Sequence, residues 1–181
     1  QGFFNIPVDE LTAIYILSDY VKSKNLNNLA VVASDFGISK RARDIARRLN
    51  CSLAIVEQKR LDNKDHKEAL NVIGDIDGKT ALIVDDEVDT AGTLINVVNM
   101  LIEHGAKDVY ACATHPVFSG PAIERIASSC LKEMIVTDSI PVNGKKKLEK
   151  ISVLSIAPLL GEAIRRIHSG QSVGEMFTQE Q

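Results

Sequence analysis

The chain has 181 residues, and its 21 lysines and arginines against 24 aspartates and glutamates give a net charge of −3. This balance argues against a nucleic-acid-binding protein that depends on a strongly basic surface. With 45% hydrophobic and 25% charged residues the composition is that of an ordinary globular protein. At about 150 residues per domain we expect residues 1–181 to form a single domain.

Short apolar runs alternate with amphipathic stretches along the chain. The runs are too continuous for a sheet with one exposed face, which favours parallel strands that are buried on both sides. The expected strands are 29–33, 53–56, 81–84, 109–113, 134–136 and 151–154. The expected helices are 11–22, 41–49, 93–104, 121–129 and 157–168. We therefore predict an α/β fold: a mostly parallel sheet with helices on both faces, and ligand-binding loops gathered at the carboxyl ends of the strands.

Two polar stretches interrupt this alternation. Residues 58–67 have no apolar face, so we expect them to form a mobile loop. Residues 143–150 contain three consecutive lysines and are interpreted as a solvated loop.

The three cysteines, Cys51, Cys112 and Cys130, form no CxxC pair and lie among apolar neighbours. Reduced thiols in a cytoplasmic protein are the expectation for this pattern. No apolar run approaches the roughly 18 residues that a membrane-spanning helix needs, and no signal peptide opens the chain. We therefore expect a cytoplasmic protein without membrane contact.

The strongest functional signal is a buried strand that leads through a small-residue loop into a helix, over residues 80–94. Backbone N–H groups near Thr90–Thr93 are free to bind an anion at the start of the helix, and Gly92 allows close approach. The carboxylates of Asp85, Asp86 and Asp89 suit the hydroxyls of a sugar or a hydrated Mg²⁺. Phosphate at one end and hydroxyls at the other indicate a pentose phosphate. The structural alternative is a helix that is capped by Asp89, with solvated acids before it.

A second loop, residues 33–41, also leads from a strand into a helix. Gly37 permits a tight turn, Ser39 can cap the helix, and Asp35 faces the expected ligand edge. A plain connection between strand and helix is the alternative interpretation.

Residues 85–93, with the sequence DDEVDTAGT, resemble the phosphoribosyl-pyrophosphate motif of type I phosphoribosyltransferases. In this form they are especially similar to the ribose-phosphate pyrophosphokinase family. Residues 1–9, 31–43, 73–75 and 114–122 resemble the same family in order and spacing. The similarity implies a type I phosphoribosyltransferase fold and covers the C-terminal half of the family's chain, without its amino-terminal ATP-binding domain.

The resemblance implies a transferase of nucleotide biosynthesis, in which Mg²⁺-dependent transfer of pyrophosphate from ATP to C1 of ribose 5-phosphate gives phosphoribosyl pyrophosphate and AMP. Two alternatives are a phosphoribosyltransferase that consumes phosphoribosyl pyrophosphate, and a non-catalytic regulatory homologue. The family also implies a homo-oligomer, a hexamer, and a separate amino-terminal domain is a further expected partner.

The resemblance assigns a role to each matching position. Lys59 and Arg60 become the catalytic cations, and Asp35 becomes a metal ligand. The residues implied in ribose 5-phosphate binding are Asp85, Asp86, Asp89, Thr90, Ala91, Gly92 and Thr93. The residues implied in the pyrophosphate loop are Asp35, Phe36, Gly37 and Ile38.

Overall fold

The computed structural model describes residues 2–60 and 67–177, with side chains described except at 58–60, 67–70 and 145. In chain order its elements are α1 (Ile14–Ser23), β1 (Leu29–Ala33), α2 (Ser39–Arg48), β2 (Ser52–Arg60), β3 (Lys67–Ile73), β4 (Thr80–Val88), α3 (Gly92–Glu103), β5 (Asp108–Pro116), α4 (Ala122–Ser128), β6 (Glu133–Thr137), the 3-10 helix η1 (Gly144–Lys146), β7 (Ile151–Leu154), α5 (Ala157–His168) and the 3-10 helix η2 (Gly174–Phe177).

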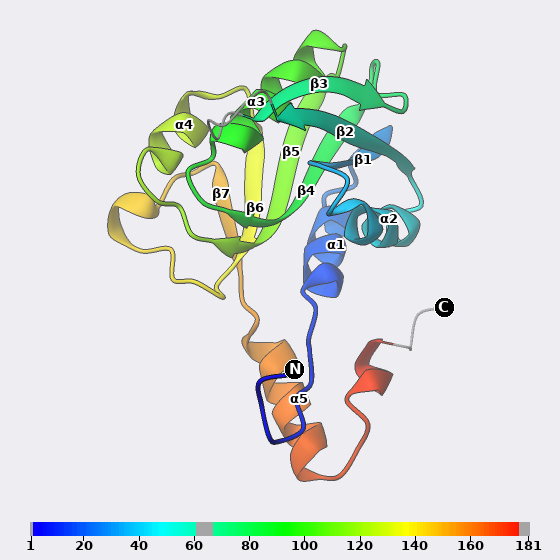
Figure 1. The fold of residues 1–181 in the computed structure, drawn as a ribbon, viewed down its shortest axis with the longest axis vertical. Helices are drawn as coiled ribbons and strands as arrows, with labels where there is room; N and C mark the ends of the chain where they lie inside the picture. Colours follow the sequence, from blue (N-terminus) through cyan, green and yellow to red (C-terminus); the bar gives the residue numbers. More distant parts are fainter. Residues whose placement is uncertain (1, 61–66, 178–181) are drawn as a thin grey trace.

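All seven strands belong to one sheet, in the order β3-β2-β1-β4-β5-β6-β7 (Figure 1). Every pair is parallel except β2 with β3, which is antiparallel. The carboxyl ends of β1, β4 and β5 therefore lie at one edge of the sheet, as the alternation of apolar and amphipathic segments predicts.

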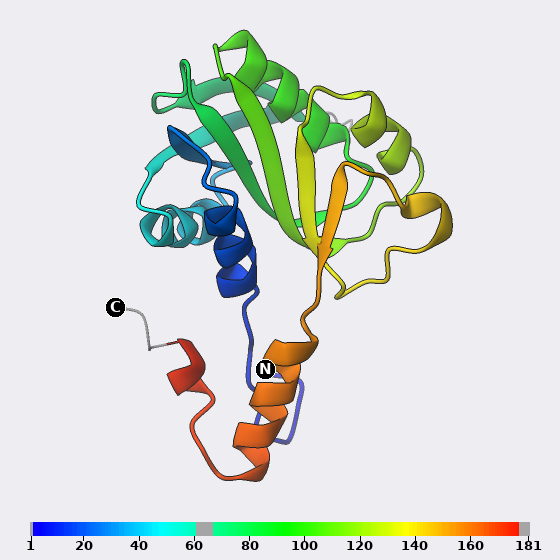
Figure 2. The ribbon, with the colours of Figure 1, turned by 180° about the vertical axis from the view of Figure 1, so that it is seen from behind.

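The sheet divides the core into two layers of side chains. Helices lie on both faces of the sheet (Figures 1 and 2). Successive residues of a central strand pack alternately: Val31 belongs to the layer under α1 and α2, and Val32 to the layer under α3 and α4. Leu82 and Ile83 of β4 divide in the same way. Two buried faces explain why these strands have continuous apolar sequences.

The prediction of a loop over residues 58–67 is wrong at both ends. Residues 58–60 extend β2, and residue 67 begins β3, a strand that the periodicity did not predict. Lys59 pairs with Glu68 and Arg60 with Lys67 in the antiparallel ladder. A polar strand is stable here because backbone pairing at the edge of a sheet does not require apolar side chains on both faces. Residues 61–66 lie outside the described part of the chain.

The prediction of a solvated loop over residues 143–150 is wrong for two of its lysines, which bind backbone carbonyl oxygens. Lys146 Nζ donates to the carbonyl oxygen of Val117 at 2.7 Å, and Lys150 Nζ donates to that of Ser129 at 2.8 Å. These lysines therefore fasten the segment between β6 and β7 to the loops that flank α4.

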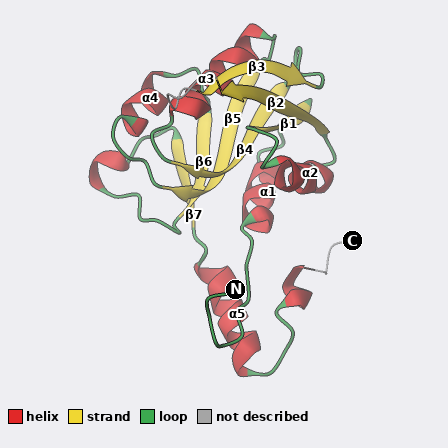
Figure 3. Cartoon of the chain, in the orientation of Figure 1, coloured by secondary structure: helices red, strands yellow, loops and turns green. Residues whose placement is uncertain are grey.

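The helix α5 lies apart from the sheet, beside the amino-terminal segment (Figure 3). Ile164 and Ile167 of this helix are 67% and 58% exposed, and Phe3 of the amino-terminal segment is fully exposed. None of the described helices combines the length and the apolar character that a membrane crossing requires.

We predict that Gly74→Ala strongly destabilises the fold. Gly74 has φ +121°, and a Cβ there would lie 2.9 Å from the Cα and Cβ atoms of Ala54 in β2. Backbone strain and overpacking together should lower the free energy of unfolding by about 2–5 kcal/mol. Gly78→Ala is the control, because φ is +66° but nothing lies within 4 Å; it should lose only about 1–2 kcal/mol. Urea unfolding measures both, and equal losses would contradict the role of the close contact.

Candidate functional site

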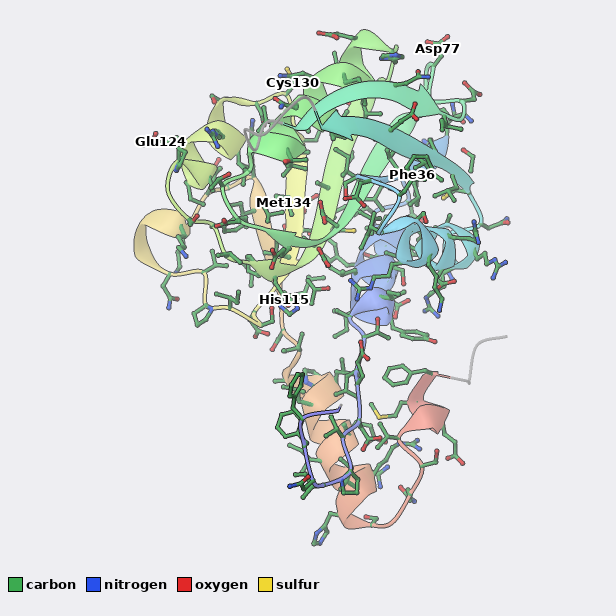
Figure 4. All side chains as sticks on the ribbon, viewed as in Figure 1. Phe36, Asp77, His115, Glu124, Cys130 and Met134 are labelled. Atoms are coloured by element: carbon green, nitrogen blue, oxygen red, sulfur yellow. The ribbon has the colours of Figure 1, made fainter. Side chains whose placement is uncertain are left out.

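A polar cavity of about 270 Å³ lies where β1 and β4 end. It is lined by residues that follow β1 and by the segment that leads from the end of β4 into α3: Ser34, Asp35, Asp85, Asp86, Glu87, Val88, Asp89, Thr90, Ala91, Gly92, Thr93 and Leu94. The structure thus brings the two segments that the sequence analysis singled out to one place. Figure 4 shows Phe36 and His115 close to this edge of the sheet.

The turn from β4 into α3 depends on the backbone of Ala91, which has φ 59° and ψ 9°. This left-handed residue ends the loop, and α3 begins directly at Gly92. Asp89 therefore does not cap the helix, and α3 has no side-chain cap. Because the first N–H groups of a helix have no partner within it, they remain available to an anion at the cavity.

Asp85 and Asp86 stand at the end of β4 in different environments. Asp85 is half-buried, and this burial raises the pKa of its carboxyl to about 6, although the Ser34 hydroxyl bonds to it. Its Oδ1 also accepts from the Asp86 N–H at 2.9 Å. Asp86 is exposed and forms an ion pair with Arg41 of α2, with 3.3 Å between Oδ2 and Nη1. The Asp85 carboxylate is thus poorly solvated, so hydroxyl donors or a cation would stabilise its charged form.

The loop after β1 is organised by Asp35. Its Oδ1 accepts from the Ile38 N–H at 3.1 Å, and a Cβ at Gly37 would lie 3.0 Å from the same oxygen. Ile38 is buried in the core, whereas Phe36 is 55% exposed. Ser39 does not cap α2 as expected, because its hydroxyl donates to the Phe36 carbonyl oxygen at 2.7 Å. Of the four residues implied in the pyrophosphate loop, 35–38, Asp35 is the one that lines the cavity.

The segment between β5 and α4 supports the loop between β4 and α3 through hydrogen bonds. Phe118 N donates to the Val88 carbonyl oxygen at 2.9 Å, and Ser119 N to that of Asp89 at 3.0 Å. The Ser119 hydroxyl also bonds to the Asp89 carboxylate. Ser119 has no predicted role, because contacts between different loops leave no periodic pattern in a sequence.

Lys59 and Arg60 lie near the end of β2, on the hairpin with β3, and their side chains lie outside the described part of the structure. Their expected catalytic role remains a prediction.

A metal site and His115 are the remaining features of this edge of the sheet. Among the described residues, no group of three or more His, Cys, Asp or Glu side chains is arranged to hold a metal ion. His115 Nδ1 lies 3.0 Å from the Ser139 hydroxyl at the carboxyl end of β5. Any metal at the cavity would therefore depend on few carboxylates together with ligand atoms and water.

Three comparisons with known proteins agree with one another. The family model of the phosphoribosyl synthetase-associated domain matches residues 59–178. A ribose-phosphate pyrophosphokinase of Oceanobacillus iheyensis is 52% identical over 177 residues, which are 98% of this chain and 56% of that protein. The corresponding protein of Bacillus subtilis is 48% identical over 178 residues, with the same shares.

Among solved structures, the phosphoribosylpyrophosphate synthetase of Mycobacterium smegmatis superposes with a TM-score of 0.84 and 38% identity. The match covers 94% of this chain and 55% of that one. The chain therefore spans little more than half the length of the proteins that it matches.

Proposed function

The chain belongs to the ribose-phosphate pyrophosphokinase family, and from this premise we propose that it forms the part of such an enzyme that binds ribose 5-phosphate. The observation that carries the proposal is the cavity at the end of β4, where carboxylates and the start of an uncapped helix face the same space. We also propose that residues 1–181 act as one phosphoribosyltransferase-like domain, the C-terminal half of the enzyme.

Each end of ribose 5-phosphate has suitable partners in this cavity. The N–H groups of the first turn of α3 and the hydroxyls of Thr90 and Thr93 suit the 5-phosphate. Asp85 and Asp86 suit the ribose hydroxyls, which donate hydrogen bonds to carboxylates. This division explains the presence of acids beside an anion site, because the acids bind the sugar and the helix end binds the phosphate.

One or two of the carboxylates of Asp35, Asp85 and Asp86 would hold a Mg²⁺ ion, together with phosphate oxygens and water. When bound, Mg²⁺ would offset the negative charge of the phosphates. Asp35 would be its ligand in the loop that receives the pyrophosphate.

In the proposed reaction, the C1 hydroxyl oxygen of ribose 5-phosphate attacks the β-phosphorus of ATP. The bond from this phosphorus to the oxygen that bridges it to the α-phosphate breaks, AMP leaves with that oxygen, and the proton of the C1 hydroxyl is released to water. The residues of this chain would hold the sugar in line for the attack, and Lys59 and Arg60 would stabilise the charge on the transferred group. We expect the complete enzyme to be a homo-oligomer.

We predict that Thr93→Val and Asp89→Ala each weaken ribose 5-phosphate binding without unfolding the chain. Both side chains are exposed at the cavity, and neither caps α3. Thr93→Val removes a hydroxyl donor to the phosphate, and Asp89→Ala removes the carboxylate that holds Ser119. Each loss should raise the dissociation constant about tenfold.

Calorimetric titration with Mg²⁺ present measures these affinities, and thermal melts check the fold. Asn96→Ala is the control, because Asn96 is exposed on the same helix but does not line the cavity. Unchanged affinity in both site variants would contradict the assignment of ribose 5-phosphate to this cavity.

We predict that Lys59→Ala in a full-length enzyme lowers the turnover number about 10²–10³-fold, since one preorganised donor to a transition state is lost. The Michaelis constant for ribose 5-phosphate should change far less. Steady-state kinetics of AMP release give both numbers. Lys22→Ala is the control, because this lysine lies in the last turn of α1, before β1 begins. Equal proportional changes in the turnover number and the Michaelis constant would indicate that Lys59 only attracts the substrate.

We predict that residues 1–181 alone bind ribose 5-phosphate with Mg²⁺ yet form almost no AMP from ATP. The relatives are almost twice as long, and loss of the rest of the ATP site would remove positioning worth about 7–11 kcal/mol. AMP release should be assayed with the chain alone and with the chain mixed with the remaining part of a full-length relative. Robust activity of the lone chain would contradict the split site. Binding with no activity in the mixture would favour the regulatory homologue.

A further inference from the structure

The cavity that we assign to ribose 5-phosphate is short of positive charge. Among the described residues its lining contains five carboxylates, Asp35, Asp85, Asp86, Glu87 and Asp89, and no lysine or arginine. A helix end contributes only about 0.3–1 kcal/mol towards an anion. A phosphate dianion at the start of α3 therefore needs a further cation close to the phosphate end of the cavity.

Arg125 of α4 brings a guanidinium to this place from behind the loop. Its Nη1 donates to the Thr90 carbonyl oxygen at 2.9 Å. The same nitrogen lies 3.3 Å from the position that a Cβ would take at Gly92, the first residue of α3. The positive charge therefore lies against the backbone from which the free N–H groups emerge.

This charge is not neutralised within the described part of the chain. No carboxylate among the described residues forms an ion pair with Arg125. Figure 4 places Glu124, its neighbour in the sequence, on the outer side of α4. Arg41, the other arginine beside the cavity, is already paired with Asp86 at the sugar end.

The hydrogen bond from Arg125 to Thr90 is one of three that engage successive carbonyl oxygens of the loop between β4 and α3. The carbonyl oxygens of Val88, Asp89 and Thr90 all accept hydrogen bonds from the segment that carries Phe118, Ser119 and Arg125. Phe118 is buried and has φ 46°, a conformation that persists only where the surroundings enforce it. These three hydrogen bonds hold the carbonyl oxygens on the side of Phe118, Ser119 and Arg125. The negative ends of the carbonyl dipoles therefore point away from the proposed anion site.

We propose that Arg125 is a positioning residue for the 5-phosphate. It fixes the Thr90 carbonyl and adds the positive charge that the lining lacks, without lining the cavity itself. The proposal rests on the proposed function, because it assigns the phosphate to the start of α3.

The test is titration of residues 1–181 with ribose 5-phosphate and Mg²⁺, at about 0.02 M and about 1 M KCl. Arg125→Gln removes the charge, Arg125→Lys keeps it without the planar fork, and Arg47→Gln is the control. Arg47 is an exposed arginine in the last turn of α2, so its replacement changes the net charge equally. Thermal melts check the fold of each variant.

At low salt we expect Arg125→Gln to bind about tenfold more weakly than the unaltered chain, with Arg125→Lys and Arg47→Gln within about threefold. At 1 M salt, where screening acts over about 3 Å, the deficit of Arg125→Gln should shrink. A purely structural role would weaken both Arg125 variants equally and independently of salt, and would overturn the proposal.

Normal binding by Arg125→Gln would also overturn it, and would leave the proposed function intact. Failure of the unaltered chain to bind would instead remove the proposed function and this inference together. If Arg125→Gln does not fold, Arg125→Lys decides, because only a charge effect is preserved by lysine and screened by salt.

Discussion

The left-handed backbone at Ala91 is the constraint on which the rest of the site depends. A residue with a Cβ loses roughly 1–2 kcal/mol in this conformation. The surroundings offset that cost, since the side chain is buried to 4% exposure in the core under α3 and α4. Because the chain turns at this residue, α3 begins immediately beside the end of β4. The unpaired N–H groups of the helix and the carboxylates of the strand then share one cavity.

That juxtaposition creates an electrostatic conflict between acids and an anion. Burial already disfavours the charged form of Asp85, as its raised pKa of about 6 indicates. The conflict is reduced by placing cations outside the lining, Arg41 on Asp86 and Arg125 behind Thr90. In the proposed function the acids accept hydrogen bonds from the sugar, and the start of α3 receives the phosphate.

The same arrangement shows how a parallel sheet supports a site made of distant segments. Asp35 and Asp85 are 50 positions apart in the sequence, but Asp35 follows β1 and Asp85 lies near the end of β4, the neighbouring strand in the sheet. The brace from Phe118, Ser119 and Arg125 follows β5, the next strand. Three adjacent strands therefore supply the residues of the cavity and the support behind it, to which we assign the sugar, the pyrophosphate and the 5-phosphate.

The sequence by itself determined the six predicted strands, the five helices and the edge at which Asp35 and Asp85 meet, because burial on both faces leaves a strong apolar pattern. It also predicted an anion site, since small residues between a strand and a helix are a local signal, and this site stays a prediction. Only the tertiary structure decided that residues 67–73 form a strand, that Ala91 rather than Asp89 precedes α3, and that Arg125 supports Thr90. These features depend on backbone pairing at a sheet edge and on hydrogen bonds between loops, and neither of these imposes a period on the amino-acid sequence.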